Sequence, residues 1–156
     1  MHATNHSRII LADEAATNAI AARLAATLQP GLMIYLRGDL GAGKTTLVRA
    51  LLHSLGHTGR VKSPTYTLLE RYVAGGLNLL HFDLYRFRDA EEWESSGFRD
   101  EFDGHNVCLV EWPEQAAGLL PPADILLTFT ILEQGRVLEL EALTTAGHLC
   151  LHALPD

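Results

Sequence analysis

The sequence predicts an α/β domain in which helices cover a central sheet that is mixed but mainly parallel. Three observations carry this prediction. An apolar run at residues 32–36, typical of a buried strand, leads directly into a glycine-rich stretch at residues 38–46. Leucine and valine then recur at helical spacing from Leu47 to Leu55. Two further pairs of apolar runs are joined by the hairpin-like segments 74–76 and 133–136, which add antiparallel strands.

The glycine-rich stretch, GDLGAGKTT, matches the phosphate-binding pattern G-x-x-x-x-G-K-[ST] at every fixed position, between a predicted strand and a predicted helix. We therefore expect a P-loop NTPase-like three-layer sandwich. Gly38, Gly41 and Gly43 allow backbone conformations closed to other residues and a close approach of phosphate. Free N–H groups at the helix start would bind that phosphate. Lys44 would reach the outer phosphates, and the Thr45 hydroxyl would bind Mg²⁺.

Chain length and net charge limit the number of domains, the partners and the location that we expect. The chain of 156 residues suits one domain with its own core, and no linker, repeat or low-complexity tract divides residues 1–156. A formal net charge of −7 disfavours stand-alone binding to nucleic acid, because neutralised phosphates supply most of that affinity. No apolar run approaches the roughly 18 residues of a membrane span. Residues 1–6 show no signal-peptide pattern, so we expect a cytoplasmic protein with no membrane partner.

The other elements follow from apolar runs and the residues that interrupt them. A strand at residues 9–11 precedes an alanine-rich helix that Asp13 or Thr17 caps and that residues 29–31 end. Further strands are expected at residues 66–72, 77–83 with 84–86 continuing it, 107–113, 125–131 and 137–143. Asp89 begins an acidic helix, and residues 97–102 form a second short one. The pattern of the tail from Thr144 fits a helix or a strand.

The segment Ser63-Pro64-Thr65 lies in the next connection after the phosphate loop and its helix. In nucleotide-binding folds of this kind, that connection often carries a hydroxyl that senses the outermost phosphate. Pro64 would stiffen the segment. Ser63 or Thr65 would then meet the phosphate or Mg²⁺. The alternative is a turn into a strand, with Ser63 as its cap.

Two acidic residues, Asp83 and Glu111, each end a predicted strand. Ligands of open α/β sheets bind at the carboxyl ends of the strands, so both acids would face the phosphate loop. One would then hold Mg²⁺ and the other would orient water. The alternative for either is a helix cap or a surface acid.

The sequence also separates the classes of small nucleotide-binding protein. Neither lysine stands in the Asn-Lys-x-Asp motif with which GTPases read guanine, and no Asp-x-x-Gly occurs. A free-standing small-molecule kinase remains an alternative, although no compact arginine-rich lid is visible. A second alternative is a non-catalytic interaction module that uses bound ATP only for its shape. No arginine is clearly placed to stabilise charge at the phosphates, so hydrolysis is expected to be slow in the isolated protein.

Four linked motifs carry a resemblance to a known family. They are residues 38–46, 63–68, 81–86 and 111–113, which read GDLGAGKTT, SPTYTL, HFDLYR and EWP. In this order and spacing the chain resembles the TsaE (formerly YjeE) family of ATPases. The resemblance implies a Mg²⁺-dependent ATPase that works with TsaB and TsaD. Those partners place threonylcarbamoyl on an adenosine beside the anticodon of tRNAs that read codons beginning with A. The ATPase would meet tRNA only indirectly and would drive turnover rather than transfer.

The resemblance also implies roles for individual residues. Thr45 and Glu111 would hold Mg²⁺, and Asp83 would be the acid needed for hydrolysis. Lys44 and Thr65 would be the other two catalytic residues. Trp112 would lie near the nucleotide. The full set expected to bind ATP is Glu14, Gly38, Asp39, Gly41, Ala42, Gly43, Lys44, Thr45, Thr46, Ser63, Trp112, Gly135 and Arg136. Of these, Glu14, Gly135 and Arg136 correspond to contacts on the adenine side.

Overall fold

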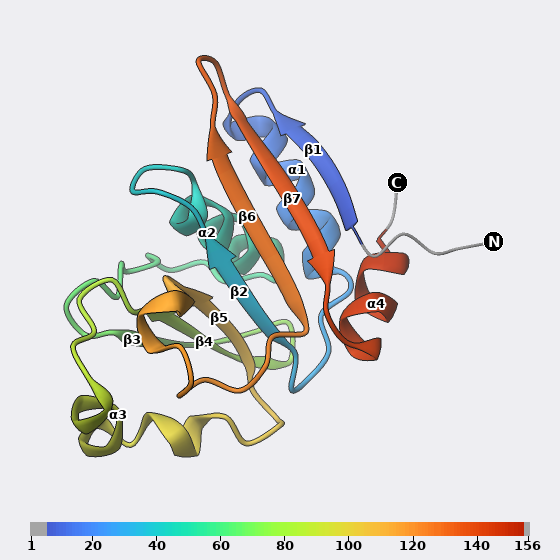
Figure 1. Cartoon of the computed structure of the whole chain (residues 1–156). Helices are drawn as coiled ribbons and strands as arrows, with labels where there is room; N and C mark the ends of the chain where they lie inside the picture. Colours follow the sequence, from blue (N-terminus) through green and yellow to red (C-terminus); the bar gives the residue numbers. More distant parts are fainter. Residues whose placement is uncertain (1–5, 155–156) are drawn as a thin grey trace.

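A seven-stranded sheet runs through the protein, whose computed structural model describes residues 6–154 (Figure 1). Its spatial order is β1-β7-β6-β2-β5-β4-β3. The four central strands β6, β2, β5 and β4 are parallel, and β1, β7 and β3 pair antiparallel. The strands are β1 His6–Leu11, β2 Met33–Arg37, β3 Leu69–Ala74, β4 Leu77–Asp83, β5 Val107–Glu111, β6 Ile125–Ile131 and β7 Arg136–Ala142. The predicted mixed α/β sandwich is thus confirmed.

Helices form a layer on each side of this sheet. The helices α1 (Glu14–Ala25) and α2 (Lys44–Ser54) lie together behind it in Figure 1 and share one apolar core with its strands. Over β4 and β5, the other face is covered by α3 (Ala90–Ser96) and the short 3₁₀ helices η1 (Phe98–Glu101) and η2 (Pro113–Ala116). Trp93 of α3 stacks there on Phe102 and meets Phe87 and Phe98 edge-on.

The N-terminal helix begins as predicted and ends earlier than predicted. The Asp13 side chain caps α1 by accepting the Ala16 N–H, so Asp13 rather than Thr17 is the cap. The helix stops at Ala25, ahead of residues 29–31. The backbone N–H and the hydroxyl of Thr27 both bond back to the Leu24 carbonyl, which tightens the last turn and ends the α-helical pattern.

Three parts of the predicted strands are wrong. The strand predicted at residues 107–113 ends at Glu111, because Trp112 takes a left-handed φ of 58° and Pro113 begins η2. Residues 66–68 form a turn, because the Leu68 N–H bonds to the Pro64 carbonyl and Leu68 takes a left-handed φ of 67°. Strand β3 therefore begins only at Leu69. Strand β4 ends at Asp83 instead of continuing to residue 86, since the Asp83 side chain accepts the Tyr85 N–H and turns the chain. The Asp83 N–H donates to the Leu68 carbonyl at 3.0 Å, which joins the turn to the strand end.

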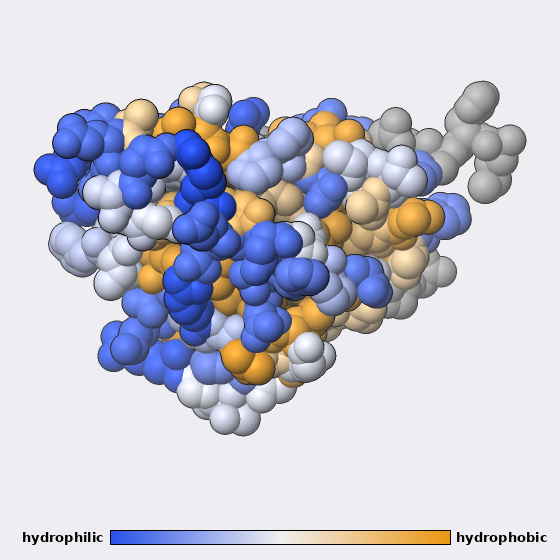
Figure 2. All heavy atoms as spheres, turned by 90° about the horizontal axis from the view of Figure 1, so that it is seen from below, coloured by the Kyte–Doolittle hydropathy of each residue, from blue (hydrophilic) through white to orange (hydrophobic). Residues whose placement is uncertain are grey.

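The tail is helical: α4 spans Thr145–His152, and the Thr144 side chain caps it by accepting the Gly147 N–H. No helix within residues 6–154 is long and apolar enough to cross a membrane. Viewed from below, hydrophobic side chains show in several places between hydrophilic ones (Figure 2). Residues 1–5, most of the stretch inspected for a signal peptide, lie outside the described residues.

Candidate nucleotide-binding site

The phosphate loop lies between the end of β2 and the start of α2, in conformations that require glycine. Gly38 has a φ of 148°, and Gly43 has a φ of 111°. A Cβ on Gly38 would stand 2.8 Å from the Phe129 carbonyl oxygen. Gly43 is the N-cap of α2, where no side chain bonds to the first turn. The N–H groups of that turn are therefore left to meet an anion, which the helix dipole also favours.

Lys44 is held beneath this loop and is only 4% exposed. Its ammonium donates to the Gly38 carbonyl, and Nζ lies 3.6 Å from the centroid of the Trp112 ring. Burial lowers the pKa of Lys44, and the negative charges of Glu111 and Asp83 oppose that shift. Within residues 6–154 the ammonium forms no ion pair closer than 4 Å. Its charge is therefore available to an anionic ligand.

The two predicted acids lie side by side at the carboxyl ends of β4 and β5, where Asp83 is registered opposite Glu111. Both are buried, with 7% and 2% of their surface exposed. Burial raises the pKa of Asp83, and the hydrogen bond from the Tyr85 N–H acts against that rise. The Thr45 hydroxyl lies 3.0 and 2.9 Å from the two carboxylate oxygens of Glu111, to which it donates. The strand ends thus bring one acid into direct contact with the phosphate loop.

The contact between Thr45 and Glu111 fits a magnesium ion in the chemistry of its donors. Mg²⁺ prefers oxygen ligands and is typically bound by one or two carboxylates together with substrate phosphates and water. A threonine hydroxyl and a buried carboxylate supply such oxygens next to the loop where phosphates would lie. Among the described residues, no lysine or arginine pairs with Glu111, so its charge is not already neutralised by a permanent cation.

The Ser63–Thr65 segment faces the same place. The hydroxyls of Ser63 and Thr65 are 2.6 Å apart and hydrogen-bonded to each other. They border a hollow of about 230 Å³ beside the phosphate loop. Its lining is Leu40, Gly41, Ala42, Gly43, Lys44, Thr45, Thr46, Ser63, Thr65, Asp83, Glu111 and Trp112. The residues expected around phosphate and metal therefore surround one space.

A second hollow of about 320 Å³ adjoins the first and shares Gly41, Gly43 and Thr46 with it. Its other walls come from the end of β1, from the start of α1 and from the turn that leads from β6 into β7. They are Leu11, Ala12, Asp13, Glu14, Thr17, Gly135 and Arg136. Arg136 closes the wall by donating from Nη2 to the Gly41 carbonyl at 3.1 Å. Glu14, Gly135 and Arg136, expected on the adenine side, are thus brought together from distant parts of the chain.

Two of the expected ligand-binding residues do not line either hollow. Gly38 lies behind the loop, where its carbonyl receives Lys44, and the exposed Asp39 closes the loop through its carbonyl to the Ala42 N–H. One contact was not predicted: the buried His81 lies against Glu111. Alternation along the predicted strand places His81 on the same face as Asp83, but the pairing of β4 with β5 is what brings it against Glu111.

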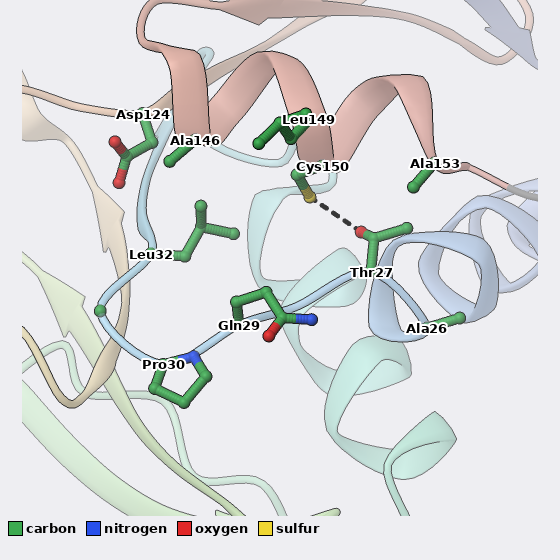
Figure 3. Close-up of a pocket in the computed structure, with 11 residues that line it drawn as sticks. Ala26, Thr27, Gln29, Pro30, Leu32, Asp124, Ala146, Leu149, Cys150 and Ala153 are labelled. Carbon is green, nitrogen blue, oxygen red and sulfur yellow. Dashed lines mark hydrogen bonds between the residues drawn. The ribbon is translucent and has the colours of Figure 1, made fainter.

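A third hollow, of about 420 Å³, lies between the end of α1 and α4 (Figure 3). Thr27 Oγ1 lies 2.8 Å from Cys150 Sγ there and donates to the Leu24 carbonyl. Asp124 accepts the Met33 N–H at 2.8 Å and the Thr144 hydroxyl at 2.7 Å. These polar groups are engaged within the fold. Among the described residues that line this third hollow there is no lysine, arginine or histidine, and its one acid, Asp124, is engaged in these two bonds.

Comparison with known proteins gives a consistent result. A family model described as "Threonylcarbamoyl adenosine biosynthesis protein TsaE" matches residues 11–138. A protein of Haemophilus influenzae named tRNA threonylcarbamoyladenosine biosynthesis protein TsaE is 51% identical over 128 residues, which are 82% of this chain and 81% of that protein. The Bacillus subtilis protein of the same name is 46% identical over 105 residues, or 67% of this chain and 65% of that protein.

The fold is also similar to that of a solved structure. The crystal structure of YdiB from Bacillus subtilis matches with a TM-score of 0.80 and 30% sequence identity. The match covers 99% of this chain and 97% of the YdiB chain. It therefore extends beyond the family-matched segment and includes the tail helix α4.

Proposed function

The chain belongs to the threonylcarbamoyl adenosine biosynthesis protein TsaE family, and from this premise we propose that it is the Mg²⁺-dependent, ATP-hydrolysing component of the machinery that forms threonylcarbamoyladenosine in tRNA. One observation carries the proposal. The phosphate loop, a direct contact between Thr45 and Glu111, and the buried Asp83 border a single hollow, and the predicted adenine-side residues border the next one.

Each group has a chemical role in this proposal. The loop N–H groups and Lys44 bind the phosphates, and Thr45 and Glu111 hold Mg²⁺. The bound ion would neutralise charge on the phosphate oxygens. Asp83 orients the attacking water, and burial, which raises the pKa of Asp83, suits it to receive a proton. Ser63 and Thr65 meet the outermost phosphate. Glu14, Gly135 and Arg136 contact the adenine side, with Trp112 beside the nucleotide.

The purpose we propose is to drive turnover of the partners TsaB and TsaD, which would carry out the transfer and meet tRNA. The net charge of −7 supports this indirect role, since an acidic surface repels RNA. We propose that the protein acts in the cytoplasm, together with these partners. None of the residues that line the phosphate hollow is an arginine. Partner proteins would then supply or order the missing charge, which in other phosphoryl-transfer enzymes is worth roughly 10³–10⁵ in rate.

The first test compares ATP turnover by the isolated protein with turnover in the presence of TsaB and TsaD. We expect slow hydrolysis alone and a large increase with both partners. Equal rates would contradict partner-driven turnover. A panel of metabolites serves as a control, since stimulation together with phosphate incorporated into a metabolite would instead indicate a small-molecule kinase.

The second test separates binding from hydrolysis. Lys44→Ala should weaken ATP binding by about 10- to 100-fold, because a charge-assisted hydrogen bond is worth roughly 1.5–3 kcal/mol. Asp83→Ala should retain binding and lose hydrolysis in the complex with TsaB and TsaD. Calorimetric titration and phosphate release measure the two properties. Normal hydrolysis by Asp83→Ala would remove Asp83 from the mechanism and leave it a structural support for the nearby loop.

A further inference from the structure

His81 is a fully buried histidine that lies behind Glu111 of the candidate site, with 0% of its surface exposed. It stands two positions before Asp83 on β4, so both side chains point to the same face of the sheet. Its Nε2 lies 2.5 Å from Oε2 of Glu111. The three side chains Thr45, Glu111 and His81 therefore form a continuous hydrogen-bonded chain from the phosphate loop into the core.

The direction of this hydrogen bond follows from its partners. An ionised carboxylate only accepts, so Nε2 of His81 donates to Glu111. The other ring nitrogen, Nδ1, is buried and has no hydrogen-bond partner in the described structure. A buried polar atom without a partner costs free energy, which an apolar residue of similar size would avoid. The imidazole is present in spite of this cost, and the one hydrogen bond that its ring makes to the described part of the chain goes to Glu111.

We propose that His81 is a positioning residue, which fixes the carboxylate of Glu111 for Mg²⁺ by donating a hydrogen bond to Oε2. This inference rests on the proposed function, in which Thr45 and Glu111 hold the metal. Among residues 6–154, the only other side chain bonded to Glu111 is Thr45, itself a proposed metal ligand whose hydroxyl would change partners when the ion binds. The bond from His81 is the one that can stay unchanged. Groups behind the ligands of metal sites commonly set ligand orientation in this way.

A purely packing role for His81 makes different predictions. If the imidazole only filled space, every substitution would change stability, and the metal-dependent part of nucleotide binding would follow the loss of folded protein. If His81 positions Glu111, the decisive property is an N–H donor at the place of Nε2. Glutamine can present an amide N–H there. Asparagine is too short to reach Glu111, and leucine has no donor.

The experiment measures the affinity for a non-hydrolysable ATP analogue by calorimetry, once with Mg²⁺ and once with EDTA. The ratio of the two dissociation constants is the metal-dependent gain. We expect His81→Leu and His81→Asn to lower this gain by about 10- to 100-fold, the usual loss when such an outer partner is removed, with little change in EDTA. His81→Gln should retain most of the gain. Phe82→Leu, a packing change on the opposite face of the same strand, is the matched control and should leave the gain intact.

Several results would overturn the inference. An unchanged gain in His81→Asn, or a His81→Gln variant as impaired as His81→Asn, would show that the donor at Nε2 is not what matters. Equal losses with Mg²⁺ and EDTA would point to packing alone. Should His81→Leu fail to fold, the glutamine and asparagine variants carry the same comparison. A wild-type protein without any metal-dependent gain would instead refute the proposed function itself.

Discussion

At the scale of single residues, the candidate site confines an ammonium group and two carboxyl groups largely away from water. Lys44, Asp83 and Glu111 are each at most 7% exposed. Burial lowers the pKa of Lys44 and raises that of Asp83, so the charged form of each is disfavoured relative to water. The folded protein without ligand therefore carries an electrostatic cost at this place. Such a cost is common where a site must bind charge.

Replacing Asp83 with asparagine should remove part of this cost. Because the pKa of Asp83 is raised above its usual 3.8 in the folded state, the ionised carboxyl destabilises the fold. Asp83→Asn should therefore increase the free energy of unfolding near pH 7. The advantage should shrink as the pH falls through the folded pKa of Asp83 and vanish below the unfolded value.

Urea unfolding at a series of pH values, in EDTA and without nucleotide, measures this difference. The exposed Asp100→Asn is the control and should change the free energy of unfolding by less than about 0.5 kcal/mol. A variant Asp83→Asn that is less stable than wild type near neutral pH would show that the ionised carboxyl group stabilises the fold, since the asparagine amide oxygen can still accept the Tyr85 N–H.

At the scale of elements, α4 can pack closely against the sheet because it has a glycine where the two meet. Gly147 is buried in the helix, and a Cβ at this position would stand 1.9 Å from the Asp124 carbonyl oxygen. The helix can therefore approach the start of β6 only without a side chain at this position. The same approach brings Cys150 next to Thr27 of the α1 end.

Gly147→Ala should destabilise the protein, by roughly 1–3 kcal/mol as for other overpacked sites. Helix propensity alone predicts the opposite sign, since alanine in a helix interior is favoured over glycine by about 1 kcal/mol. The free energy of unfolding of Gly147→Ala, measured by chemical denaturation, distinguishes between these two effects. Ala146→Gly, at the neighbouring exposed position of α4, is the matched control and should cost no more than about 1 kcal/mol, the cost of glycine in a helix. A stabilised Gly147→Ala would mean that α4 can shift outward at little cost.

Elements were predictable from the sequence where local chemistry decides them. The phosphate loop and the two hairpins have strong local patterns and appear where expected, and β4 and β5 begin where expected but end earlier, at Asp83 and Glu111. Residues 66–68 look like a strand in composition, but a backbone hydrogen bond to Pro64 folds them into a turn. The contact of His81 with Glu111 depends on which strands become neighbours in the sheet. The strands β4 and β5 lie far apart in the sequence and meet only when they pair. Local periodicity does not contain that information.

At the scale of the whole molecule, the candidate site is assembled from nearly the full length of the chain. The start of α1, the phosphate loop, the ends of β4 and β5 and the turn between β6 and β7 all reach it. Arg136 joins the last of these parts to the first turn of the phosphate loop through the Gly41 carbonyl. Binding of a nucleotide would therefore stabilise the molecule as a unit rather than one loop of it.

Arg136→Ala should weaken ATP binding about tenfold, which corresponds to ~1.4 kcal/mol, because the variant loses both a wall of the second hollow and its bond to Gly41. The metal-dependent gain in affinity should remain, since Arg136 is not part of the Thr45–Glu111 contact. Calorimetry with Mg²⁺ and with EDTA measures both quantities. Arg88→Ala, an exposed arginine paired with Glu92 beside α3, is the control and should bind ATP like wild type. Unaltered binding by Arg136→Ala would place the base elsewhere.

The hydrogen bond from the Asp83 N–H to the Leu68 carbonyl has a consequence for kinetics. Leu68 ends the turn that follows Ser63 and Thr65, so the amide hydrogen of Asp83 can exchange with deuterium only when that turn separates from the strand end. The exchange rate of this single amide therefore measures how often the turn after Ser63 and Thr65 opens. The measurement detects this motion at Asp83, the residue proposed to act in hydrolysis, and needs no probe attached to the protein.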